Sequence, residues 1–350
     1  MWFVSILVLI FMLGIIILVH ELGHFLWAKK FGVYIYEFSI GMGPVIHKHK
    51  GKDGIFYNIR AIPIGGFVAM AGENGEDGEG KEVKKKDLLC NKKWWQRLII
   101  LAAGVINNFI LALILLFVCS LIWGGTTISN EIVEVIKDSP AEKAGLQKGD
   151  KILAIDGHKF SSWDVSQIRI LMKSKDGSHT FTVKNNAGKK DLKVKPKFIK
   201  DEKGDEFPLY GFAPKQEVHK GFLSSLKFAF QKFNDTIKSM WITIGGLFSG
   251  KLSVKYLSGP VGIYEAVDTM VSIGIEQVLN LFILLSINVG FINILPFPAF
   301  DGGHILFLLI EKIKGSPVNP KVEGVINTIG LILLLLLMAV ITLKDIIHLF

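Results

Sequence analysis

Val19-His20-Glu21-Leu22-Gly23-His24-Phe25 closes an apolar run that starts at Met1 and has no charged residue before Glu21. On a helix, His20 and His24 lie one turn apart on the same face, so both imidazoles can reach one tetrahedral Zn²⁺. Glu21 is rotated by roughly 100° from His20, where it can contact a metal-bound water as a general base. An ionisable side chain at membrane depth costs roughly 2.5–3.5 kcal/mol, which a bound metal would offset. We therefore expect a zinc site here, the alternative being a pair of hydrogen-bonded core histidines.

The composition favours a membrane protein. Half of the 350 residues are hydrophobic, 25 of them Phe, and the mean hydropathy is +0.43. The net charge of +9 then reads as a topology signal, and we expect no nucleic-acid partner. Cys90 lies in a charged loop and Cys119 in an apolar run, so a disulfide framework is not expected.

Four apolar segments are long enough to cross a bilayer: about 2–27, 98–123, 278–295 with a further apolar piece to 310, and 325–343. The first is expected to be a retained span, because it lacks a basic start and a small-residue cleavage site. The loop 29–97 carries 13 Lys and Arg, and the connection after the third span is also basic. The positive-inside rule places both connections in the cytoplasm, and both chain ends and the segment 124–250 outside.

Two segments of the first loop stand out. Residues Ile55–Met70 read as two extended runs about a Pro63-Ile64-Gly65-Gly66 break, which predicts a hairpin. Its apolarity predicts that it lies against the membrane or protein, or is an ordinary buried hairpin. Residues 73–86 are rich in Gly, Glu and Lys and predict a mobile linker.

The segment from about Asn130 to Lys197 predicts a small α/β domain of alternating strands, turns and two short helices. Its Ser139-Pro140-Ala141-x-x-Ala144-Gly145-Leu146-x-x-Gly149-Asp150-x-Ile152 resembles a PDZ domain over some 70 residues. PDZ domains bind extended peptide ends by adding a strand to a sheet edge. The alternative is a spacer that only blocks access. Residues Phe222–Phe248 then predict an amphipathic interfacial helix.

The third span ends in an unusually polar stretch. Two asparagines, Asn288 and Asn293, precede Pro296 and Pro298, which must break the helix, and Asp301 follows. A catalytic zinc usually has three protein ligands and one open position, and Asp301 would be the third beside the two histidines. His304, three residues further on, competes for that role.

These features together resemble the bacterial site-2 proteases of the regulator-of-sigma-E protease type, which are intramembrane zinc metalloproteases. The resemblance covers nearly the whole chain and rests on several motifs: His20-Glu21-x-x-His24, Phe38-Ser39-Ile40-Gly41-x-Gly43-Pro44, Ile62-Pro63-x-Gly65-Gly66-Phe67-Val68, the PDZ pattern, Ser258-Gly259-Pro260-Val261-Gly262-Ile263 and Asn293-x-x-Pro296-x-Pro298-x-x-Asp301-Gly302-Gly303.

The resemblance implies a set of roles. His20, His24 and Asp301 would bind zinc, and Glu21 would be the base. Substrate contacts would come from Asn288, Asn293, Pro296, Gly65, Gly66, Phe67 and Val68, with the membrane-associated hairpin at 54–72. The chain departs from the family pattern at Phe300, usually Leu, and at Gly104-Val105, usually Gly-Pro, whereas Asn108 matches. One PDZ domain is found, where the best-known enterobacterial member has two.

The expected fold is a polytopic α-helical membrane protein with four spans, a membrane-associated β-hairpin and one extracytoplasmic PDZ domain. The expected divisions are a membrane half at 1–125, the PDZ domain at 126–215, the interfacial helix at 216–258 and a second membrane half at 259–350.

The expected function is zinc-dependent cleavage of single-span membrane proteins in the bacterial cell membrane, with the active site toward the cytoplasm. The resemblance implies anti-sigma factors or signal-peptide remnants as substrates. Two other functions would fit parts of the sequence. A membrane scaffold that captures peptide ends would not need Glu21, and a zinc-binding transporter would need neither hairpin nor PDZ domain.

Overall fold

The computed structural model describes residues 2–73, 83–171, 177–185, 188–200, 206–253 and 257–349. Most of the linker predicted at 73–86 lies outside the described residues. The chain divides into two compact units, each described here by itself. The first contains residues 1–115 and 258–349, and the second contains residues 116–257 with the final residue.

Within the described residues, four helices are long and apolar enough to cross a membrane, which confirms the four predicted segments. They are α1 (Trp2–Lys30), α2 (Trp94–Trp123), α7 (Ile275–Ile294) and α9 (Pro320–Leu349). Many of their apolar side chains face outward: Leu333, Leu335 and Leu336 of α9 each keep more than half of their surface exposed. A hydrocarbon layer is the environment that covers such side chains. The architecture is that of a multi-pass helical membrane protein.

The predicted break after the third span is confirmed. Helix α7 ends at Ile294, and α8 (Asp301–Lys314) starts after a proline-containing turn. In that turn Ala299 adopts φ 74°, a left-handed conformation that is unfavourable for a residue with a Cβ. Its N–H donates to Oδ1 of Asn327 on α9, 3.4 Å away. The turn thus places Asp301 at the first position of α8.

Helix α6 (Pro260–Ile273) was not predicted from the sequence. It packs against α1, α7 and α9. The carboxylate of Asp345 on α9 accepts the N–H groups of Gly259 and Gly262 at 2.7 and 3.0 Å, and so caps the start of α6. Ser5 of α1 donates to Asp268 at 2.6 Å. These contacts join residues from distant parts of the chain, so a local sequence pattern could not indicate them.

The loop between α1 and α2 forms a sheet of two long strands, β1 (Ile35–Lys50) and β2 (Phe56–Met70). The predicted hairpin about Pro63-Ile64-Gly65-Gly66 is wrong in its pairing, because both halves of β2 pair with β1. Residues 45–50 pair with 56–60, and residues 35–40 pair with 66–70. Residues 37–40 also pair with 56–59, so this part of β1 has a neighbour on each side.

The sequence missed β1 because Gly41, Gly43 and Pro44 read as chain breakers. Both glycines have positive φ, 87° and 84°, and allow the strand to bend between its two halves. A Cβ on Gly41 would lie 2.5 Å from the carbonyl oxygen of Ile62, so only glycine fits there.

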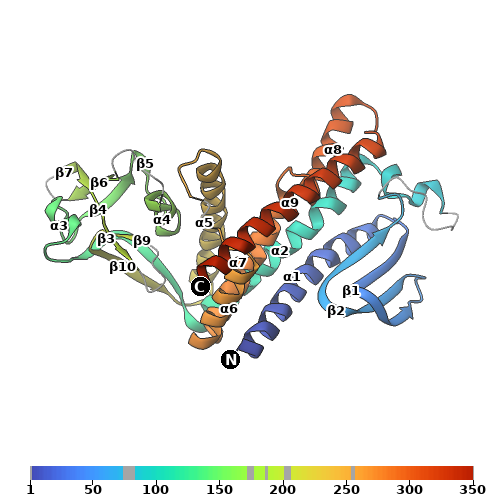
Figure 1. Cartoon of the computed structure of the whole chain (residues 1–350), viewed down its shortest axis with the longest axis horizontal. Coiled ribbons are helices and arrows are strands. Elements are labelled where there is room, and N and C mark those ends of the chain that lie inside the picture. The colour runs from blue at the N-terminus through green and yellow to red at the C-terminus, as the bar shows by residue number, and fades with distance from the viewer. Residues whose placement is uncertain are drawn as a thin grey trace. The chain divides into compact units, whose positions relative to one another are not determined.

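One face of this sheet packs on the C-terminal half of α1, beside which it lies in Figure 1. Phe38, Val68 and Met70 from the sheet are buried with Phe25 and Ala28 from α1. This contact buries part of the loop's apolar surface and fixes the sheet beside the His-Glu motif, whereas Ile46, Ile59 and Ile62 stay exposed. Two single-turn 3₁₀ helices, Lys85–Asp87 and Leu89–Asn91, precede α2.

The second unit contains a sheet with strand order β10-β3-β4-β6-β7, in which β5 pairs with β4, and a separate β8–β9 pair. The strands are β3 (Gly125–Val135), β4 (Lys151–Ile155), β5 (His158–Lys159), β6 (His179–Asn185), β7 (Gly188–Val194), β8 (Lys197–Lys200), β9 (Glu206–Leu209) and β10 (Phe212–His219). Ile132, Phe181 and Val183 are fully buried in its core.

This unit contains the two short helices that the sequence predicts and a long helix with the predicted bounds Phe222–Phe248. They are α3 (Pro140–Lys143), α4 (Trp163–Leu171) and α5 (Phe222–Phe248). Ser139 caps α3, because its Oγ accepts the N–H of Glu142 at 3.2 Å. Strand β10 pairs with β3, so the sheet is complete only at His219.

Candidate metal centre

Three side chains converge at the junction of α1 and α8. Nε2 of His20 lies 3.2 Å from Nε2 of His24. Oδ2 of Asp301 lies 3.0 Å from the first nitrogen and 3.4 Å from the second. Among the described residues, this is the group of His, Cys, Asp and Glu side chains whose ligand atoms are close enough to hold one metal ion.

The spacing of these three atoms suits zinc. Ligands about 2.0–2.1 Å from a tetrahedral Zn²⁺ are roughly 3.3 Å apart, close to the observed separations. Oδ2 of Asp301 is buried and has no hydrogen-bond partner within the described chain, although the two ring nitrogens face it. Two imidazoles and one carboxylate leave a fourth position open for water or substrate, as in catalytic zinc sites.

Helix α2 orients the imidazole of His24. Its Nδ1 donates to the carbonyl oxygen of Ile100 at 2.8 Å. That bond assigns the ring proton to Nδ1 and leaves the Nε2 lone pair for a metal.

Asn108 of α2 orients His20. Its amide nitrogen is placed 3.4 Å from Nδ1 of His20, while its Oδ1 is buried without a partner in the described chain. Turning the amide so that its N and O exchange places lets Oδ1 accept a hydrogen bond from the Nδ1–H of His20. That orientation satisfies the buried oxygen and again frees Nε2.

The close approach of α1 and α2 depends on two glycines. A Cβ on Gly104 would lie 2.7 Å from Nε2 of His20, so any side chain there would displace the ring. Gly23 faces the backbone of Ala103 and Gly104 with no room for a Cβ. The sequence singled out Gly104 and Asn108 through the family resemblance, but not the contacts they make.

Glu21 lies between the histidines and the sheet. Its carboxylate accepts the backbone N–H of Val68. A Cβ on Gly66 would lie 3.8 Å from Cγ of Glu21, so β2 passes directly beside this carboxylate. Glu21 is thereby held next to the three converging ligand atoms but outside their group.

His304 does not join the group. Its Nδ1 lies 3.1 Å from Oε1 of Glu323 on α9, and the pair lines a separate pocket with Glu311 and Arg97. The geometry therefore favours Asp301 over His304 as the third ligand.

The predicted substrate contacts lie on two elements. On β2, Gly65 has φ 85°, Gly66 and Val68 are buried, and Phe67 is half-buried. On α7, Asn288 and Asn293 are half-buried and Pro296, just past its end, is exposed. The two asparagines are five residues apart, which turns them by roughly 140° from each other, so they cannot face one substrate segment equally.

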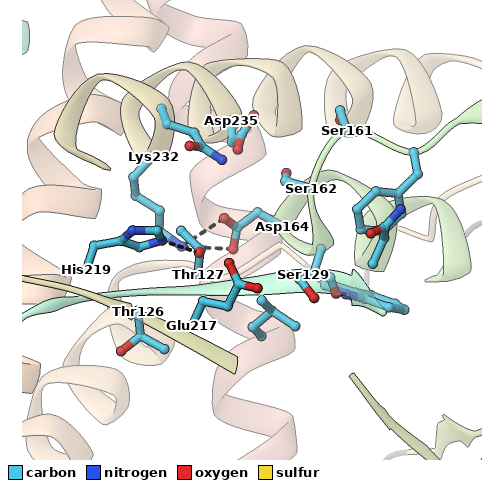
Figure 2. A pocket seen from close by; sticks show the side chains of 15 residues that line it. Thr126, Thr127, Ser129, Ser161, Ser162, Asp164, Glu217, His219, Lys232 and Asp235 are labelled. Atoms are coloured by element: carbon cyan, nitrogen blue, oxygen red, sulfur yellow. Dashed lines mark hydrogen bonds and ion pairs between the residues drawn. The ribbon is translucent and has the colours of Figure 1, made fainter. Parts of the chain in front are cut away.

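A second polar site lies in the other unit, where α5 meets the sheet (Figure 2). Nζ of Lys232 on α5 contacts Oδ1 of Asp164 on α4 at 2.8 Å, and Thr127 pairs with His219 at 2.7 Å. Asp235, also on α5, is buried, and burial raises the pKa of its carboxyl. The Lys232–Asp164 ion pair joins α5 to α4, which fits a packing contact of α5 within this unit.

The comparisons with known proteins agree with this geometry. The family profile described as peptidase family M50 matches residues 8–337. The chain belongs to peptidase family M50. M50 peptidases are the site-2 protease family, so the predicted resemblance is confirmed.

Curated relatives of this M50 chain match over nearly its whole length. A putative zinc metalloprotease of Fusobacterium nucleatum is 40% identical and the match covers 98% of this chain and 99% of that protein. The zinc metalloprotease RasP of Shouchella clausii is 34% identical, with 99% of each covered. The regulator of sigma-W protease RasP of Bacillus subtilis is 31% identical, with 99% of each covered.

The M50 chain is therefore a zinc metalloprotease, as predicted. Among solved structures, the PDZ domain of an SdrC-like protein from Listeria innocua matches 25% of this chain and 92% of its own length. It is 27% identical, with a TM-score of 0.21. The PDZ assignment stays a prediction.

Proposed function

We propose that this M50 peptidase is an intramembrane endopeptidase that cleaves the membrane segments of single-span proteins. The observation that carries the proposal is the convergence of His20, His24 and Asp301 within 3.0–3.4 Å beside Glu21. His20, Glu21 and His24 lie on α1, which is long enough to span a membrane. In this proposal the three converging side chains are the zinc ligands and Glu21 is the general base.

Bound Zn²⁺ would supply Lewis acidity toward a peptide carbonyl and would lower the pKa of a coordinated water. The protein residues transfer the protons and orient the reacting groups. Glu21 takes a proton from the attacking water and passes it to the departing amine. The Val68 N–H holds the Glu21 carboxylate in place for both transfers. The Ile100 carbonyl and Asn108 keep both imidazoles directed at the centre.

A substrate helix hides its peptide bonds in i→i−4 hydrogen bonds and must unwind before cleavage. Residues 66–69 of β2 pair with β1 on one side only, and the described sheet holds no third strand. The unpaired side of this segment faces Glu21, as the Val68 bond indicates. An extended substrate added to that edge would run past the catalytic groups.

The basic loops support an orientation with both chain ends outside and the active site toward the cytoplasm. The second unit would then be extracytoplasmic, as a PDZ domain that binds peptide ends or excludes bulky substrates. One relative is named a regulator of a sigma factor, so anti-sigma factors with a trimmed extracellular part are the substrate class we favour, beside signal-peptide remnants.

The test is reconstitution of the purified chain in liposomes with a single-span substrate, followed by mass spectrometry of the products. We expect cleavage inside the membrane segment, loss of cleavage on zinc chelation and recovery on zinc addition. Cleavage only in extramembrane loops would contradict the proposal. Zinc binding without cleavage of any membrane substrate would favour the scaffold or the transporter.

A further inference from the structure

A network of polar side chains joins the segments of the β1–β2 sheet on the face turned away from α1. The carboxylate of Glu37 accepts a hydrogen bond from Nδ2 of Asn58 at 2.6 Å. It also forms an ion pair with Nη2 of Arg60 at 2.7 Å. Ser39 and Asn58 are fully buried within it. Across the strands, Ser39 has Asn58 on one side and Phe67 on the other.

The Arg60 side chain contacts β1 at three residues and the second half of β2 at Phe67. Its Nη1 donates to the carbonyl of Gly43 at 2.7 Å and its Nε donates to Oγ of Ser39 at 3.2 Å. Its Cζ lies 4.7 Å from the centre of the Phe67 ring, a cation–π distance. Three directed donors and a flat face on one side chain are a property of guanidinium that the point charge of lysine lacks.

Phe67 lies between Gly66 and Val68, the two residues of β2 beside Glu21. Successive side chains of a strand alternate between faces, so Phe67 points to the polar network while Gly66 and Val68 face α1. The Val68 N–H points to Glu21 and away from β1, and the backbone groups of Gly66, two residues earlier, point the same way. The Arg60 guanidinium thus contacts, through Phe67, the edge of β2 that would receive a substrate.

We propose that Arg60, held by Glu37, is a positioning residue that fixes the 66–68 edge of β2 for strand pairing with the substrate. The inference rests on the proposed function, since it needs a substrate aligned on this edge. Arg60 contacts neither the metal ligands nor Glu21, so its removal should leave zinc binding intact. It should impair only the alignment of an extended substrate.

The test compares Arg60→Gln, Arg60→Lys and Glu37→Gln with wild type in the reconstituted enzyme. Lys48→Gln is the matched control, because Lys48 lies 4.1 Å from the ring centre of Phe56 in the same sheet but does not reach residues 66–68. We expect full zinc content throughout and at least tenfold lower kcat/KM in the three test variants. Lys48→Gln should remain within twofold of wild type, and Arg60→Lys should not restore activity.

A second substrate separates positioning from general damage. It carries proline beside the scissile bond, so it lacks an N–H needed for strand pairing. Wild type should cleave it slowly, and Arg60→Gln should add no further loss. An equal fold-loss on both substrates, loss of zinc in Arg60→Gln and Glu37→Gln, or unchanged cleavage in both variants would each overturn the inference. Failure of wild type to cleave the unmodified substrate would instead count against the proposed function.

Discussion

At the scale of single residues, Asp301 and His304 lie about one helical turn apart on α8, and only Asp301 is proposed as a zinc ligand. Asp301 begins α8 and faces two imidazoles, whereas His304 pairs with Glu323. We expect Asp301→Ala to lose most bound zinc and His304→Ala to retain it, because only the first removes an atom of the converging group. Metal analysis of the purified variants measures this. Zinc kept by Asp301→Ala and lost by His304→Ala would reverse the assignment.

Ala299 sets the approach of Asp301 to the histidines. Its φ of 74° costs about 1 kcal/mol in a residue with a Cβ, a cost that glycine avoids. We expect Ala299→Gly to keep its zinc and to raise thermal stability slightly. Ala299→Val should lower both the zinc content and the thermal stability, since β-branched residues are the least suited to this conformation. Thermal unfolding in detergent with zinc analysis tests the pair, and the opposite order of stabilities would show that the turn is not strained.

At the scale of elements, the contact of β2 with α1 places the β2 edge beside Glu21, where we propose that it aligns the substrate. A Cβ on Gly66 would lie 2.7 Å from the carbonyl oxygen of Ser39 and would point toward Glu21. We expect Gly66→Ala to reduce cleavage at least tenfold while zinc content is unchanged, because the edge shifts but the ligands do not. Gly324→Ala on α9 is the control, since nothing lies within 4 Å of its Cβ position. Equal activity of the two variants would mean that β2 plays no part in substrate alignment.

At the scale of the whole molecule, the sheet of the second unit closes only when β10 pairs with β3. A clean deletion therefore removes residues 125–219, with a Gly/Ser linker joining the ends. We expect zinc binding to survive, because every residue of the candidate centre lies in the first unit. We also expect cleavage of substrates whose extracellular part has not been trimmed.

Matched trimmed and untrimmed versions of one substrate decide this prediction. If the deleted enzyme cleaves only the trimmed form, exclusion by size is wrong. If it keeps its zinc but cleaves neither form, the second unit instead helps substrates bind or stabilises the spans.

The sequence was most informative where the signal is local. His20 and His24 follow a helical spacing, and Asp301 is an expensive residue in an apolar segment, so the four spans and the ligand candidates could be predicted. The pairing of Nδ1 of His24 with Ile100 could not, because it depends on how α1 packs against α2. Strand β1 was missed because a glycine bend interrupts its sequence pattern. Helix α6 was missed because Asp345, 86 residues away from Gly259, stabilises its start.

The central claim is that Glu21 acts on the substrate beside a metal held by other residues, and Glu21→Gln tests it most directly. Zinc content and turnover of a single-span substrate are measured on the same preparation of wild type and variant. We expect the same zinc content in both and a turnover lower by about 10²–10⁴ in the variant, the usual contribution of a general base. Loss of zinc in Glu21→Gln, or turnover close to wild type, would contradict the account.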